Sequence, residues 1–149
     1  MQIKTSRLIK GLLTCLLLLS CVSVYHAAND TRFTLKNGVI YDAILGLQWA
    51  PAPNRSMNHY KAEEYARNLS LAGGGWRLPT RAELKSLYEP SKPGGADPKL
   101  NVSDFFVWTS ELNGPSDAWF FDFNNGNEYR NGRDNSNNND RVLAVRSRR

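Results

Sequence analysis

The segment Gly75–Leu84, Gly-Trp-Arg-Leu-Pro-Thr-Arg-Ala-Glu-Leu, predicts a short strand that turns directly into a helix. Pro79 ends the strand, because its ring fixes φ and removes the backbone N–H. Thr80 is the expected N-cap, and Glu83 three residues later completes a capping box. The apolar residues that follow keep helical spacing, at Leu84, Leu87 and Tyr88. The segment therefore defines a scaffold, and it carries no catalytic motif.

The first twenty residues predict an export signal. Three basic residues precede a short apolar run from Gly11 to Ser20, which is too short to span a bilayer comfortably. The run ends in Leu-Leu-Ser-Cys, which resembles the lipobox of bacterial lipoproteins, so we expect a lipid on Cys21. The alternative is an ordinary cleaved signal in which Cys21 is incidental. The expected organisation is a signal peptide over 1–20, a tether over 21–30 and a folded domain over 31–147.

Charge and cysteine content exclude several classes of function. The chain has 19 Lys and Arg against 14 Asp and Glu, but three of the basic residues lie in the signal. In the rest of the chain the basic and acidic residues nearly balance, so its charge does not indicate nucleic acid as a partner. The two cysteines, Cys15 and Cys21, both precede the expected domain. We therefore expect no disulfide, no cysteine-based zinc site and no cofactor.

The order of elements predicts an α+β fold with two helices packed on antiparallel sheets. Helices are expected over 59–69, with Asn58 as N-cap, and after Thr80. Asn37-Gly38 and Asn124-Asn125-Gly126 are hairpin signals. Strands are expected over 32–36, 39–41, 44–49, 76–78, 105–110, 119–123, 127–130 and 141–146.

Several stretches together resemble the C-terminal domain family of the Legionella collagen-like adhesin, found in exported bacterial proteins. These stretches are Gly46–Trp49, Tyr65–Leu69, Gly75–Thr80 with Glu83-Leu84, Trp108–Ser110, Ala118-Trp119, Phe121–Phe123 with Gly126, Arg141-Val142 and Val145-Arg146. The resemblance implies a C-type-lectin-like fold, akin to formylglycine-generating enzymes, with the N- and C-terminal strands paired. In the adhesin, this domain takes part in binding sulfated polysaccharides and in self-association. The resemblance also implies that many relatives carry a pair of cysteines at two positions where this chain has Ala66 and Ala144.

Candidate ligand-binding residues are one tryptophan and four arginines. A core position is the expectation for each of the four tryptophans, and the alternative is that Trp119, which follows a polar loop, exposes its indole to stack on a sugar ring. The arginines suit sulfate or carboxylate if they share a face, and otherwise pair with acidic residues: Arg130, Arg133, Arg141 and Arg146. The Asn-rich loop 131–140 alternates like a calcium loop, but Asn139 and Val145 occupy positions where an EF-hand needs Gly and Glu. A solvated loop without a metal site is therefore expected, and a looser calcium site is the alternative.

These features predict a non-catalytic binding or adhesion module of the cell envelope. Its expected partner is a glycan, another polyanion or an envelope protein, contacted through the loops 112–118 and 131–140 and the arginines. The alternative is a structural or assembly module that contacts another envelope protein or itself. An enzyme related to the formylglycine-generating superfamily is disfavoured, because those enzymes use active-site cysteines. The expected location is an outer-membrane or periplasm-facing lipoprotein, and the alternative is a secreted protein.

Overall fold

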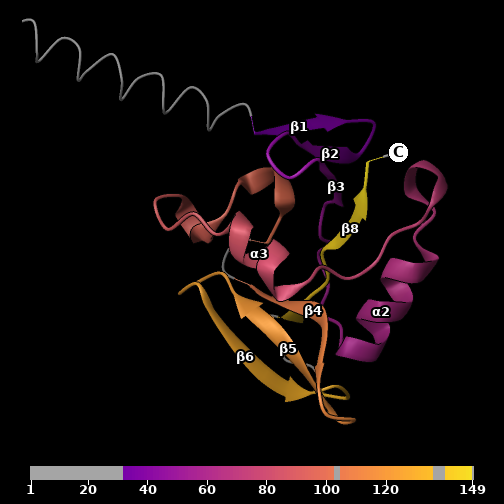
Figure 1. The fold of residues 1–149 in the computed structure, drawn as a ribbon, viewed down its shortest axis with the longest axis vertical. Helices are drawn as coiled ribbons and strands as arrows, with labels where there is room; N and C mark the ends of the chain where they lie inside the picture. Colours follow the sequence, from indigo (N-terminus) through magenta and orange to yellow (C-terminus); the bar gives the residue numbers. More distant parts are fainter. Residues whose placement is uncertain (1–31, 103–104, 136–139, 149) are drawn as a thin grey trace, which may run out of the picture. The chain divides into compact units, whose positions relative to one another are not determined.

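The computed structural model describes residues 32–102, 105–135 and 140–148, and a single compact unit begins at Phe33. The unit holds two four-stranded sheets and two α-helices (Figure 1), which confirms the α+β prediction. The signal, the tether and Cys21 lie outside the described residues. Within the described ranges, no helix is long and apolar enough to cross a membrane.

The first sheet holds both ends of the compact unit. Its order is β1 (Phe33–Lys36), β2 (Val39–Asp42), β3 (Leu47–Ala50) and β8 (Ala144–Ser147), all antiparallel. Asn37 and Gly38 both have positive φ, as the predicted two-residue hairpin requires. The expected pairing of the first and last strands is wrong, because the meander leaves β1 at one edge and β8 pairs with β3 at the other.

The turn between β2 and β3 is longer than expected. The predicted strand 44–49 begins only at Leu47, because the Asp42 carboxylate holds the preceding residues in a turn. Its Oδ1 accepts the backbone N–H groups of Ile44 at 2.9 Å and Leu45 at 3.1 Å. The Ile44 and Leu45 side chains are 65% and 39% exposed. One carboxylate thus fixes a turn that presents two apolar side chains to solvent.

The second sheet is mixed rather than antiparallel. Its order is β6 (Asn127–Gly132), β5 (Asp117–Asp122), β4 (Phe106–Asn113) and β7 (Asp140–Arg141), and β7 runs parallel to β4. The single strand expected over 141–146 is wrong, since β7 joins this sheet and β8 joins the first one. Val142 and Leu143 link the two strands, and both are fully buried. A half-buried strand would bury only one of two successive residues.

Both predicted helices are present with their caps. Asn58 caps α2 (His59–Asn68), and Thr80 with Glu83 forms the complete capping box of α3 (Arg81–Leu87). The strand expected over 76–78 is reduced to one bridge, in which Arg77 and Val145 exchange two backbone hydrogen bonds. The connections also contain three short 3-10 turns: η1 (Leu71–Gly73), η2 (Pro93–Gly95) and η3 (Pro98–Leu100).

The core forms two hydrophobic clusters that share the first sheet. Trp49 belongs to one cluster, and Trp76 and Trp108 belong to the other. These three tryptophans are buried, as expected. Ala66 and Ala144 both lie buried in the second cluster. That these two alanines replace a cysteine pair of the relatives stays a prediction.

We expect Thr80→Ala to lower the free energy of unfolding by about 1 kcal/mol, because it leaves the Glu83 N–H at the start of α3 without its cap. Urea denaturation of the purified chain measures the change. Thr34→Ala, in the exposed edge strand β1, is the control and is expected to change it by less than about 0.5 kcal/mol. Equal losses in the two variants would contradict the assigned capping role.

Candidate functional site

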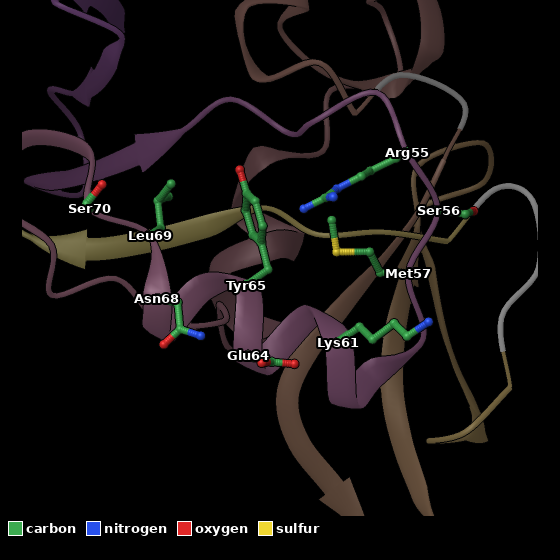
Figure 2. A pocket seen from close by; sticks show the side chains of 9 residues that line it. All are labelled: Arg55, Ser56, Met57, Lys61, Glu64, Tyr65, Asn68, Leu69 and Ser70. Carbon is green, nitrogen blue, oxygen red and sulfur yellow. The ribbon is translucent and has the colours of Figure 1, made fainter.

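A groove of about 600 Å³ lies between the outer face of α2 and the segment that precedes the helix (Figure 2). Its lining mixes charged, polar and apolar side chains: Arg55, Ser56, Met57, Lys61, Glu64, Tyr65, Asn68, Leu69 and Ser70. The groove is large enough for a small ligand or for one or two residues of a polymer.

One wall of the groove is a single stripe of α2. Lys61, Glu64, Tyr65 and Asn68 are spaced three and four residues apart, so they share one face of the helix. The opposite face carries His59, Ala62 and Ala66, all of which are buried. The core therefore fixes the rotation of α2 and directs the polar stripe outward.

Contacts at both ends fix the other wall, residues 52–57. The Ala52 N–H donates to the carbonyl of Leu100 at 3.1 Å. At the other end, the buried indole N–H of Trp108 donates to the carbonyl of Met57 at 2.9 Å. The Met57 N–H donates in turn to the carbonyl of Asp140 at 3.2 Å. Because these partners belong to other elements, the groove is formed by the fold and needs no ligand to shape it.

The groove presents two cations beside an aromatic ring. The guanidinium carbon of Arg55 lies 5.4 Å from the ring centroid of Tyr65, and Figure 2 shows the two side chains pointing toward one another. Within the described chain, neither Arg55 nor Lys61 lies within ion-pair distance of a carboxylate. Glu64 is the acidic member of the lining. The arrangement can bind an anionic group and pack an apolar ring face against Tyr65.

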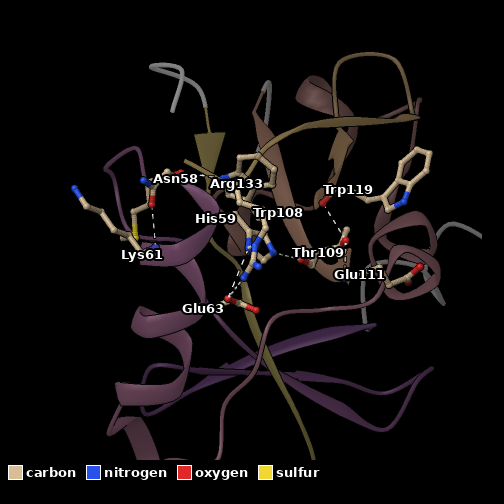
Figure 3. A network of polar contacts seen from close by, with 10 residues as sticks. Asn58, His59, Lys61, Glu63, Trp108, Thr109, Glu111, Trp119 and Arg133 are labelled. Carbon is tan, nitrogen blue, oxygen red and sulfur yellow. Dashed lines mark hydrogen bonds and ion pairs between the residues drawn. The ribbon is translucent and has the colours of Figure 1, made fainter. Parts of the chain in front are cut away.

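A buried histidine secures the start of α2 (Figure 3). His59 Nε2 lies 2.9 Å from the carbonyl of Thr109, and Arg133 Nε–H donates to His59 Nδ1 at 3.2 Å. Since Nδ1 accepts, the proton resides on Nε2 and the ring is neutral. Arg133 also pairs with Glu63 at 2.8 Å. The network ties α2 to β4 and to the end of β6.

Burial is the main cause of the lowered pKa of His59, and the positive charge of Arg133 lowers it further. The Thr109 carbonyl and Glu63 favour the protonated form, but they do not outweigh burial. His59 thus has both ring nitrogens engaged and acts as a structural residue beside the groove.

The structure brings together two of the five candidate ligand residues. Trp119 and Arg130 are cross-strand partners on β5 and β6, so their side chains share a face of the second sheet. Trp119 is partly exposed, which fits the alternative to a core position, and the guanidinium of Arg81 lies 4.1 Å from its ring centroid. Arg81 also pairs with Glu128. This face is a second polar surface, separate from the lining of the groove.

The other three arginines do not share a face and contact protein groups. Arg133 pairs with Glu63, as described. Arg141 is buried with its guanidinium 3.8 Å from the ring centroid of Phe105. Arg146 is buried against Trp76 and donates to the side chain of Gln48 at 2.8 Å. Their roles in ligand binding stay predictions, and the single arginine-rich face on which these roles depended is absent from the described residues.

The Asn-rich loop 131–140 is described only in part. Its residues 136–139 lie outside the described ranges. Among the described residues, no group of three or more His, Cys, Asp or Glu side chains is placed to hold a metal ion. The expected loop 112–118 is shorter than predicted, because β4 continues to Asn113 and β5 begins at Asp117.

Sequence reasoning missed the groove. The outward stripe of α2 follows from helical spacing once Asn58 is taken as the cap. The second wall has no such signal, because Arg55 follows two prolines without periodicity. Its place beside Tyr65 depends on contacts of Met57 with Trp108 and Asp140, which are distant in sequence.

Comparison with known proteins identifies one family. The model of the Lcl C-terminal domain family matches residues 38–146, which include both helices and seven of the eight strands in full or in part. The match confirms the resemblance inferred from the tryptophan-arginine-leucine-proline stretch and its companions. No curated protein matches the chain.

His59 predicts a pH dependence of stability. At a pH well above 6.5 the imidazole is neutral in both the folded and the unfolded state. As the pH falls below 6.5, the unfolded chain takes up a proton that the folded chain does not, so the free energy of unfolding decreases until the lowered pKa is reached. We expect His59→Gln, which keeps a donor and an acceptor, to lose this part of the dependence.

Urea denaturation gives the free energy of unfolding of wild type and of His59→Gln at about pH 8 and about pH 5. The quantity compared is the decrease of this free energy from the higher to the lower pH. The account is contradicted if wild type and His59→Gln lose the same amount.

Proposed function

Because this chain belongs to the Lcl C-terminal domain family, we propose that it is a non-catalytic binding module of the cell envelope that recognises an acidic glycan. The ligand class is a polysaccharide that carries sulfate or carboxylate groups. The binding site is the groove beside α2, with Arg55 and Lys61 as the anion contacts and Tyr65 as the surface for a sugar ring.

The observation that carries this proposal is the pair of cations that no described carboxylate neutralises, set beside an aromatic side chain. Arginine binds sulfate and carboxylate through two parallel N–H donors, and lysine adds a point charge. The amide of Asn68 and the hydroxyl of Ser70 offer hydrogen bonds to sugar hydroxyls. Binding that depends on such exposed charges weakens as salt increases.

The absence of catalysis is part of the proposal. Both cysteines of the chain precede the matched region, so it contains no cysteine of the kind that formylglycine-generating enzymes use. His59 is buried with both ring nitrogens engaged, which leaves it no proton to exchange with a substrate.

The anchor and the finer fold belong to the same proposal. A lipid on Cys21 would hold the domain at the membrane, with the outer membrane or the periplasm as its location. The C-type-lectin-like fold is supported by two helices that accompany two sheets, and by first and last strands that share one sheet.

A second candidate function is assembly with an envelope protein or another copy of the chain. The observation that favours it is a row of aromatic side chains across the second sheet. Phe120 has its ring centroid 5.3 Å from that of Phe106 and 5.8 Å from that of Tyr129. Tyr129 is 43% exposed on β6, which is an edge strand. An exposed aromatic row at a sheet edge is suited to protein contact.

We expect Arg55→Ser/Lys61→Ser to weaken the binding of a heparin oligosaccharide by at least tenfold at low salt, because each variant residue removes a charge-assisted contact. Isothermal titration calorimetry of the purified chain measures the dissociation constant. Arg67→Ser/Lys85→Ser is the matched control, since it removes two exposed cations that do not line the groove. The control is expected to change the constant by less than about threefold.

Two outcomes would overturn the assignment of the groove. If Trp119→Ser/Arg130→Ser abolishes binding and the groove variant does not, the ligand binds the second sheet. If wild type binds no sulfated or carboxylated glycan, the glycan proposal is wrong and the assembly function replaces it.

A further inference from the structure

We propose that the turn between β2 and β3 contacts the surface of an anionic lipid bilayer, with Ile44 and Leu45 entering the interface and Arg148 near the phosphate groups. This inference rests on the proposed anchoring at Cys21, and it concerns a different surface from the glycan groove.

The turn presents its apolar side chains in a fixed geometry. The Asp42 carboxylate accepts the N–H groups of both Ile44 and Leu45, and the Asp42 carbonyl accepts the N–H of Gly46 at 3.0 Å. The indole N–H of the buried Trp49 donates to the other Asp42 oxygen at 3.4 Å. Asp42 itself is buried. Because these apolar side chains are exposed, they contribute little burial energy to the fold and are available for contact with a partner.

The strand register places this turn where the chain enters and leaves the domain. Phe33 is the partner of Asp42, and Leu47 is the partner of Ser147. The first residue of β1, the turn and the last residue of β8 therefore lie at one end of the first sheet. A membrane anchor that precedes Phe33 in the chain is therefore joined to the domain at this end.

The same end carries positive charge. Arg148 follows Ser147, the partner of Leu47, and it lines a second groove, of about 490 Å³, together with Ala43 of the turn. Asp42 is the acidic residue of that lining, and its oxygens already accept hydrogen bonds from the turn and from Trp49. An apolar tip beside a cation matches the order of a bilayer surface, in which anionic headgroups cover the apolar chains.

Because the predicted lipid anchor keeps the domain close to the bilayer, even a weak contact between the turn and the bilayer is sufficient. Eleven residues lie between Cys21 and Phe33, so the covalent chain reaches at most about 40 Å from the lipid. A contact within that reach is intramolecular, and a site with low affinity for vesicles in solution is then occupied much of the time. The small area of the turn, which would not bind a membrane alone, fits this arrangement.

The test uses the full chain, processed by its host, purified in detergent and reconstituted into vesicles that contain phosphatidylglycerol and nitroxide-labelled lipids. A fluorophore is attached to Ala43→Cys in the turn, or to Pro115→Cys in the turn of the β4–β5 hairpin; the expected processing removes Cys15 with the signal. Figure 1 shows that hairpin on the opposite side of the domain from β1 and β2. The parent without an added cysteine gives the background.

We expect lipid quenching at position 43 to exceed that at position 115 by at least threefold. Adding Ile44→Ser/Leu45→Ser is expected to remove this difference, and vesicles of phosphatidylcholine alone are expected to reduce it. Equal quenching at the two positions, or a difference that survives the double substitution, would overturn the proposal. A difference of equal size in neutral vesicles would overturn the role of Arg148.

Glycan titrations of the same preparations keep the two proposals apart. Ile44→Ser/Leu45→Ser is expected to leave heparin binding within about twofold of wild type, because neither residue lines the groove beside α2. If Ile44→Ser/Leu45→Ser loses membrane contact but keeps glycan binding, the turn contacts the membrane and takes no part in glycan binding.

Discussion

The buried indole of Trp108 is the contact on which the candidate site depends. Trp108 is fully buried in β4, and its N–H reaches out of the second sheet to the carbonyl of Met57. Its ring meets His59 edge-on, with centroids 5.4 Å apart. One side chain thus positions both the segment before α2 and the first turn of the helix. The two walls of the groove are consequently properties of the core, and they are preorganised for a ligand.

The two proposed contact surfaces belong to different elements, which allows them to act independently. The groove is built from α2 and residues 55–57, whereas the lipid-facing turn belongs to the first sheet. The link between the sheets is the buried pair Val142-Leu143, where the chain passes from β7 to β8. With the proposed membrane contact at the turn and the proposed ligand site beside α2, the domain would bind its ligand while it stays at the membrane.

The sequence was most informative where structure is set by near neighbours. The capping box of α3, the Asn58 cap of α2 and the Asn37-Gly38 hairpin each depend on residues within a few positions, and all three are confirmed. The failures involve distant partners. The pattern over 141–146 alternates like one strand, yet its two halves join different sheets. Arg146 was expected to bind a ligand or to pair with an acidic residue, but in the fold it is buried against Trp76 and donates to Gln48.

The most direct test of the central claim is an NMR map of backbone amides while a heparin oligosaccharide is added to the ¹⁵N-labelled chain. The account predicts that the shifted amides cluster at residues 55–57 and 61–70, around the groove. It also predicts that these shifts diminish as salt is added, because the contacts are exposed charges. Shifts confined to β5 and β6, around Trp119 and Arg130, would contradict the account.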